Sequence, residues 1–266
     1  MINYEYTDRT LITWAHQLEV TAYSGWGDAM TATVEGAASP SGSCSLSNSS
    51  FPAQPLQPTS TWRIGEAFYN STATAIGAIG FCTTTWQLTF RAPGGYTPAG
   101  MTYARNNVRC DNATPNANPG CVVYWYAPPV FYSQTNTPDL ANHVARAQAS
   151  GLPGGTFDRP LTRITNPDLQ EKNRQLACGD APSITDKSCD EYPLASTKQG
   201  LYTTPGGARR TFDGCSFNLP QTTGPTGVSV CMIAASNNNS QGGTMSNFYR
   251  AERVLDNDDY RVLVIA

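Results

Sequence analysis

Eight cysteines constrain this chain more than any other feature. Their number is even, no two are spaced as Cys-x-x-Cys, and only two histidines, His16 and His143, are present to complete a zinc site. This pattern favours four disulfides over a thiolate metal site. The sequence does not settle the pairing, but Cys110 with Cys121 and Cys178 with Cys189 are economical neighbours. A framework of disulfides predicts folding in an oxidising compartment, so the protein is expected to be secreted.

The composition agrees with a loop-rich β protein outside the cell. Only 14% of the 266 residues are charged, and Gly, Pro, Ser, Thr and Asn are abundant. The length suits two domains. No signal-peptide pattern opens the chain, so Met1 is expected to begin a mature or trimmed form, and no apolar run is long enough to cross a membrane.

The first part of the chain has the pattern of an antiparallel β-sandwich. Short alternating runs such as 18–23 and 85–90 are separated by Pro/Gly/Ser turns. Cys44 and Cys82 are expected to join the two sheets, and 122–126 is predicted as the last strand. We therefore predict a sandwich domain of unassigned role over 1–133. The five tryptophans all lie here and are expected in its core rather than on a platform for sugars or bases.

The second part, 134–266, has an α+β pattern. A helix is predicted from Thr137 to Gly151, and a second one from an Asn166 cap to Cys178. Buried strands are predicted over 228–234 and 261–265. Between them a helix should begin near 240–243. It should turn three side chains inward: Met245, Phe248 and Tyr249.

Two motifs in this part carry residues suited to phosphodiester chemistry. The run at 188–197 reads Ser-Cys-Asp-Glu-Tyr-Pro-Leu-Ala-Ser-Thr, and 237–243 reads Asn-Asn-Asn-Ser-Gln-Gly-Gly. A carboxylate can activate water, and a further oxygen ligand can hold a hard divalent cation against a phosphate. If Asp190 and Glu191 lie on a strand, their side chains point to opposite faces, which argues against a glycosidase carboxylate pair.

Together the two motifs resemble those of the NucA/NucB-type secreted deoxyribonucleases, in an actinobacterial-like branch. The resemblance extends to 109–111, 140–151, 161–163 and 173–178 and covers most of 105–266. It implies a ββα-metal-type nuclease domain that cuts DNA internally with Mg²⁺ or Mn²⁺. By the same resemblance, Glu191 is the general base, Asp190 is a catalytic or metal-binding carboxylate, and Asn239 is a metal ligand.

The chain also departs from the family pattern. Simpler members have Asn-Arg-Gly-Ala-Gly where 239–243 read Asn-Ser-Gln-Gly-Gly, so another cation must contact the phosphate. The candidate cations are Lys198, Arg209, Arg210 and Arg250, and the predicted substrate-binding residues are Lys198, Gln241 and Arg250. Asn237 and Asn238 remain open as alternative ligands or as helix caps. His143 is interpreted as a half-buried helix residue without a catalytic role.

The expected partner is DNA, although the net charge of −3 leaves only a local basic groove to bind it. A scavenging nuclease and a toxin paired with an immunity or inhibitor protein both remain open. Serine hydrolase, Walker and dinucleotide-binding signatures are absent. The alternative from another class is a non-enzymatic extracellular adhesin that binds its ligand with the β-sandwich.

Overall fold

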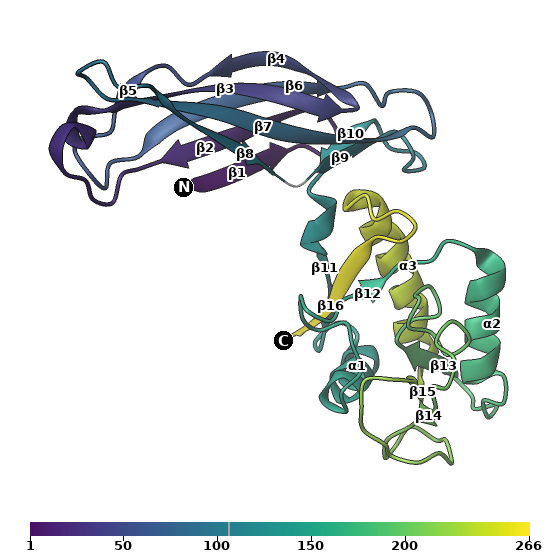
Figure 1. The fold of residues 1–266 in the computed structure, drawn as a ribbon. Helices are drawn as coiled ribbons and strands as arrows, with labels where there is room; N and C mark the ends of the chain where they lie inside the picture. The colour runs from purple at the N-terminus through teal and green to yellow at the C-terminus, as the bar shows by residue number, and fades with distance from the viewer. Residues whose placement is uncertain (106) are drawn as a thin grey trace. The chain divides into compact units, whose positions relative to one another are not determined.

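The computed structural model describes residues 1–105 and 107–266, a mixed α+β chain in two compact units, Met1–Val123 and Tyr124–Ala266 (Figure 1). The division falls earlier than the expected boundary after residue 133. Strand β11 (Pro129–Ser133) pairs in parallel with β16 (Asp259–Ile265), so it belongs to the second unit. The strand predicted over 122–126 is wrong beyond Val122, because Tyr124–Tyr126 form a 3-10 helix, η2.

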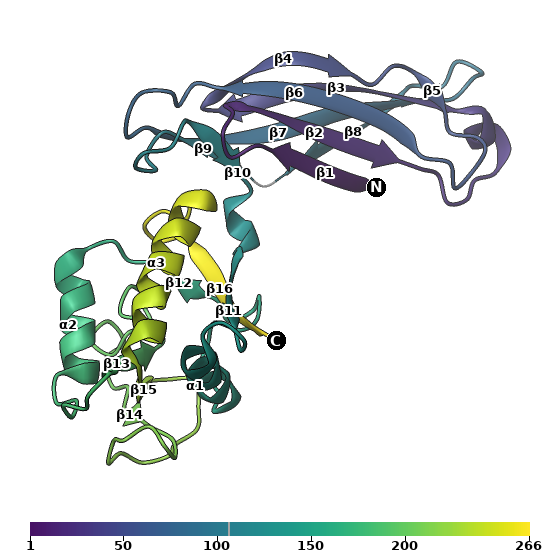
Figure 2. The same cartoon turned by 180° about the vertical axis from the view of Figure 1, so that it is seen from behind.

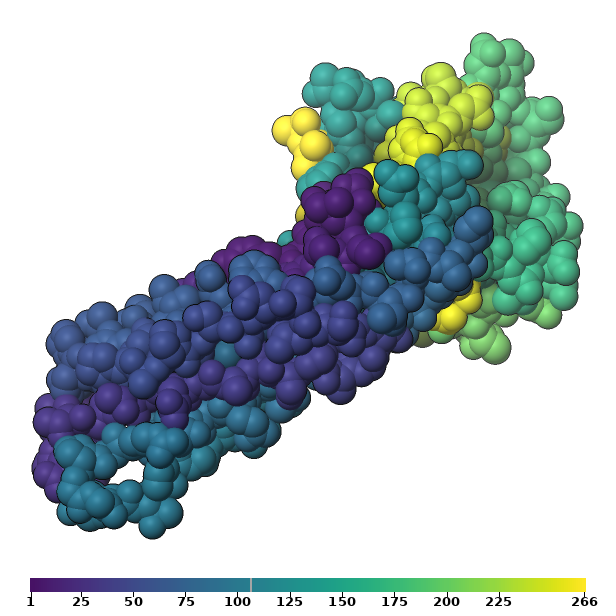
Figure 3. Space-filling model, turned by 90° about the horizontal axis from the view of Figure 1, so that it is seen from above, coloured from purple at the N-terminus to yellow at the C-terminus, as the bar shows by residue number. Residues whose placement is uncertain are grey.

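The N-terminal unit consists of two antiparallel sheets and is elongated along its strands (Figures 1 and 3). The first sheet has the order β1 (Ile2–Thr7), β2 (Thr13–Val20), β6 (Arg63–Ser71) and β4 (Cys44–Ser50). The second sheet has the order β10 (Gly120–Val122), β9 (Val108–Asp111), β7 (Ile79–Arg91), β3 (Thr33–Gly42) and β5 (Gln54–Pro55). Strand β8 (Ala99–Ala104) also pairs with β7. A short 3-10 helix, η1 (Gly27–Thr31), lies outside both sheets.

The core of this unit combines inward side chains from both sheets, as the alternating sequence pattern predicts. On β6, buried and exposed residues alternate along almost the whole strand. Trp14 and Trp86 are buried, and the indole N–H of Trp86 donates to Nδ1 of His16 over 3.1 Å. The expectation that all tryptophans form core is wrong for Trp26 and Trp62, which are 84% and 39% exposed, and for Trp125 in the second unit.

The C-terminal unit places three helices around two small sheets. The helices are α1 (Pro138–Ala149), α2 (Pro167–Cys178) and α3 (Ala235–Ala251). One sheet has the order β11, β16 and β12 (Leu161–Thr162), and the other has the order β13 (Lys187–Tyr192), β15 (Val228–Ala234) and β14 (Arg209–Arg210). None of the described helices is both long and apolar enough to span a bilayer.

The predicted helices and strands of this unit are confirmed, with one difference in α3. The amide oxygen of Asn166 accepts from the backbone N–H groups of Asp168 and Leu169, so it caps α2 as expected. Helix α3 begins at Ala235, before the predicted start near 240–243. The glycine-rich motif therefore lies inside α3 and not at its first turn. Met245 is buried on α3, as predicted.

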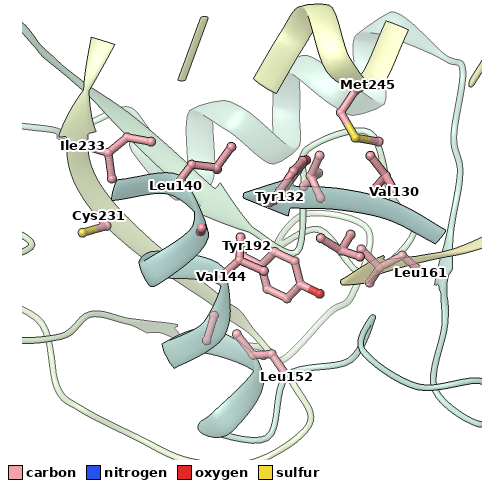
Figure 4. Packing of buried hydrophobic residues seen from close by; sticks show 14 of the residues in the cluster. Val130, Tyr132, Leu140, Val144, Leu152, Leu161, Tyr192, Cys231, Ile233 and Met245 are labelled. Carbon is pink, nitrogen blue, oxygen red and sulfur yellow. The ribbon is translucent and has the colours of Figure 1, made fainter. Parts of the chain in front are cut away.

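A shared apolar core holds these elements together. Leu140 and Val144 of α1 pack among Tyr132 of β11, Tyr192 of β13 and Ile233 of β15 (Figure 4). Strand β13 lies between α2 and α3 in both views of the ribbon (Figures 1 and 2). This placement matters for function, because β13 carries the Asp-Glu motif.

All eight cysteines form disulfides. The three predicted pairs are confirmed: Cys44–Cys82 joins the two sheets of the N-terminal unit, Cys110–Cys121 joins β9 to β10, and Cys178–Cys189 joins α2 to β13. The fourth pair is Cys215–Cys231, which ties a loop to β15. The framework therefore braces both units.

Candidate active site

Strand β13 directs the two acidic residues of the motif to opposite faces, as its alternation requires. It pairs antiparallel with β15, with Asp190 opposite Cys231 and Glu191 opposite Val230. Asp190 is only 2% exposed, whereas Glu191 is partly exposed. The two carboxylates therefore have different surroundings and cannot act on one bond together.

Asp190 belongs to a buried hydrogen-bond network that links α1 to the β13–β15 pair. Its Oδ2 lies 2.6 Å from Nδ1 of His143, and Nε2 of His143 lies 2.8 Å from Oγ of Ser229. His143 is 2% exposed, so the expectation that it is half-buried is wrong. Because every member is buried and paired, the network can orient β13 with little freedom.

Glu191 lines a polar pocket of about 360 Å³ between α2, β13 and α3. Its walls combine side chains from these elements with the segment that follows β13. The lining residues are Arg174, Cys178, Cys189, Glu191, Leu194, Ala195, Ser196, Asn238, Gln241, Gly242 and Met245. Among the described residues of this lining, Glu191 is the one carboxylate and Arg174 the one cation.

The environment of Glu191 raises its pKa to about 7. Burial is the largest cause, since it disfavours the charged form, and the neighbouring charge of Asp190 acts in the same direction. Arg174 and the backbone N–H of Ala195 oppose the rise. A carboxylate with this pKa is a stronger base than an ordinary glutamate and is still substantially ionised at neutral pH.

Asn238 is held on the pocket wall by its own amide group. Its Nδ2 donates to Oγ of Ser188 and to the backbone oxygen of Cys189, each over 2.9 Å. These bonds leave Oδ1 without a hydrogen-bond partner among the residues that the structure describes. Asn238 lines the pocket with its amide group fixed, so its oxygen is a candidate ligand there.

These oxygens suit a hard divalent cation. Glu191, Asn238 and Gln241 supply one carboxylate and two amide groups to the same pocket. No cluster of three or more His, Cys, Asp or Glu residues occurs within the described part of the chain, so a zinc-type site is not present there. Mg²⁺ and Mn²⁺ bind through oxygen ligands, and Mg²⁺ commonly keeps several waters and uses only one or two protein groups, which fits this set.

A comparison with protein families identifies the domain that contains this pocket. Residues 159–263 match the family model for deoxyribonuclease NucA/NucB. The C-terminal unit carries a NucA/NucB deoxyribonuclease domain. Every residue that lines the Glu191 pocket falls inside the matched segment. No curated protein matches the chain.

Within the NucA/NucB domain, the structure brings together some of the predicted site residues and leaves others outside the pocket. Glu191 and Gln241 line it, but Asp190, Asn239, Lys198 and Arg250 do not. Asp190 faces α1, and Asn239 is exposed on α3. Along a helix successive side chains diverge by about 100°, so Asn238 and Asn239 cannot both face β13.

The cations that the sequence suggests as phosphate contacts lie outside the Glu191 pocket. Arg250 is exposed and donates to Asn247. Arg209 pairs with Asp180, and Arg210 is buried and donates to backbone oxygens of Ser150, Gly224 and Thr226. Arg209 therefore holds the segment after α2, and Arg210 joins the end of α1 to the loop at 224–226.

Arg174 is the pocket cation that sequence reasoning missed. It lies on α2, and its exposed side chain pairs with Glu171 over 2.6 Å. A signal was available: Arg174 precedes Cys178 by one helical turn, and Cys178 is bonded to Cys189, two residues before Glu191 on the same strand face. The predicted disulfide therefore already placed Arg174 near the motif.

Proposed function

We propose that this protein is a secreted, divalent-metal-dependent endonuclease that hydrolyses DNA at the Glu191 pocket. The observation that carries the proposal is one carboxylate with a pKa of about 7, facing an oriented amide oxygen and a cation inside the matched nuclease segment. The antiparallel pair β13 and β15 followed by α3 is compatible with the ββα-metal arrangement that the sequence resemblance implies.

In this proposal Glu191 is the general base. Its carboxylate accepts a proton from a water molecule while the water oxygen forms a bond to the scissile phosphorus. The bond from phosphorus to the leaving oxygen breaks, and that oxygen takes a proton from solvent. Arg174 lies on the same pocket and can pair with a non-bridging phosphate oxygen, which places a positive charge where negative charge develops.

The divalent ion would be held by Asn238 and Gln241, which replace Asn239 and Asp190 in the assignment made from the sequence. When bound, Mg²⁺ or Mn²⁺ supplies Lewis-acid stabilisation of negative charge on the phosphate and the leaving oxygen. Asp190 acts through the fold. Its bond to His143 holds the strand that presents Glu191, and its charge raises the pKa of that residue.

Secretion is proposed from the disulfides. Four bridges in a chain without free cysteines are typical of oxidising compartments and rare in the cytosol. Extracellular DNA is then the substrate that such an enzyme would meet.

The test is cleavage of supercoiled plasmid by the full chain with Mg²⁺ or Mn²⁺, with and without a chelator. An endonuclease converts closed circles to nicked and then linear DNA, and chelation should stop it. Cleavage that persists in the chelator would contradict the metal requirement. Degradation of linear DNA alone, with closed circles left intact, would contradict internal cutting.

A further inference from the structure

The outer face of the four-stranded sheet carries exposed aromatic side chains in register. Tyr6 of β1 is 53% exposed and Phe68 of β6 is 43% exposed. Both are paired with Ala15 of β2, which lies between them. Directly opposed residues of antiparallel strands project from the same face, and two strand spacings separate the aromatic residues by roughly 9.5 Å. Two rings therefore flank a small side chain.

This arrangement forms a trough with apolar walls and a polar rim. It has a volume of about 630 Å³. Ala15 forms part of its floor, and hydroxyl, amide and carboxylate groups line it at Thr13, Asn48 and Asp8. Tyr4 is stacked against Tyr6 with ring centroids 6.2 Å apart, and it extends the aromatic surface along β1.

The charges of the trough restrict what it can hold. Among the described residues of its lining, Asp8 is the one charged group, and neither Lys nor Arg occurs. Two further carboxylates, Glu66 and Glu19, lie on the same outer face. Glu66 pairs with Gln17, and Glu19 pairs with Ile64. A nucleic acid needs cations opposite its phosphates, so this acidic face does not suit the substrate of the nuclease pocket.

We propose that this trough binds a neutral polysaccharide and is a site separate from the nuclease pocket. A sugar ring has C–H faces that pack on aromatic rings and a rim of hydroxyl groups that donate to carboxylate and amide oxygens. The trough offers both kinds of contact. The spacing between its walls, Tyr6 and Phe68, suits one sugar ring. The occupant is uncharged, because the lining holds one carboxylate and no Lys or Arg, and Arg9, whose charge acts on Asp8, does not line the trough.

The experiment uses the full chain and three neutral polysaccharides: insoluble cellulose and chitin in pull-down assays, and soluble starch in affinity electrophoresis. The variants are Tyr6→Ala and Phe68→Ala, which remove the walls, and Ala15→Leu, which fills the floor. Tyr23→Ala is the matched control, because Tyr23 is 92% exposed and does not line the trough. Circular dichroism and thermal unfolding of each variant report whether the N-terminal unit is folded, because DNA cleavage by the second compact unit does not.

The proposal predicts binding to at least one of the three polysaccharides. Each trough variant should raise the dissociation constant about tenfold or more, as loss of a central aromatic contact does, while Tyr23→Ala binds like the parent. Absence of binding to all three would overturn it, as would binding that the trough variants do not change. Self-association of the parent that Ala15→Leu abolishes would also overturn it, by showing that the face joins two copies of the chain.

Discussion

The pH dependence of DNA cleavage follows from the environment of Glu191. With a pKa of about 7, the carboxylate is ionised to about one part in ten at pH 6 and about one part in a hundred at pH 5. The general base must be ionised, so kcat/KM should fall about tenfold for each pH unit below 7 and reach a plateau above it. A glutamate at its ordinary pKa would remain almost fully ionised at pH 6.

Asp190→Asn changes this profile in a defined direction. Burial is the larger cause of the raised pKa, and it stays in place, but the negative charge that also raises the pKa is removed. The acid limb of the profile, in which kcat/KM falls as the pH is lowered, should therefore move to lower pH while keeping its slope. The assay is plasmid nicking at a fixed concentration of Mg²⁺ or Mn²⁺ from pH 5 to 9, with thermal unfolding measured at each pH.

The control for this experiment is Glu35→Gln, a carboxylate of the N-terminal unit that pairs with Arg91 outside the pocket. Its profile should match that of the parent. An acid limb near pH 4.5 in the parent chain would refute the assigned environment of Glu191. A limb that moves to higher pH in a folded Asp190→Asn variant would refute the electrostatic role of Asp190.

Three further predictions concern the metal, the substrate and the disulfides. Asn238→Ala should raise the Mg²⁺ concentration needed for half-maximal cleavage roughly tenfold or more, whereas Asn239→Ala should leave it unchanged; equal effects would contradict the choice of Asn238. Arg174→Ala should weaken DNA binding and reduce the salt slope by about one phosphate contact in a titration from low to physiological salt, and an unchanged slope would remove Arg174 from the substrate site. Denatured, unreduced protein should show no titratable thiol, and reduction should lower the free energy of unfolding by roughly 2 to 4 kcal/mol for each bridge, so several free thiols would contradict the framework.

Much of the fold could be predicted because its signals are local. The cap at Asn166 is set by residues two and three positions away, and the strand at 228–234 is a short run of mainly apolar residues in which Val and Ile recur. Neighbouring cysteines also indicated their own pairing. The boundary between units was placed too late, because β11 depends on β16 at the other end of the chain, and no local pattern reports that contact.

The site could be predicted only in part, since its geometry depends on contacts between distant segments. Alternation along a strand already separated Asp190 from Glu191. His143, the partner of Asp190, lies 47 residues before it, and Ser229, which contacts the same imidazole ring, is 86 residues from His143, so nothing near the motif indicates this network. Three consecutive asparagines at 237–239 look equivalent in sequence. Only the orientation of α3 against β13 distinguishes Asn238.

The most direct test of the central claim is the cleavage rate of Glu191→Gln, which keeps the size of the side chain and removes its basic oxygen. If Glu191 is the general base, the rate of plasmid nicking at saturating Mg²⁺ should fall by roughly 10² to 10⁴, while thermal unfolding stays close to that of the parent. A folded Glu191→Gln variant that nicks plasmid at the parental rate would contradict the assignment of this pocket as the catalytic site.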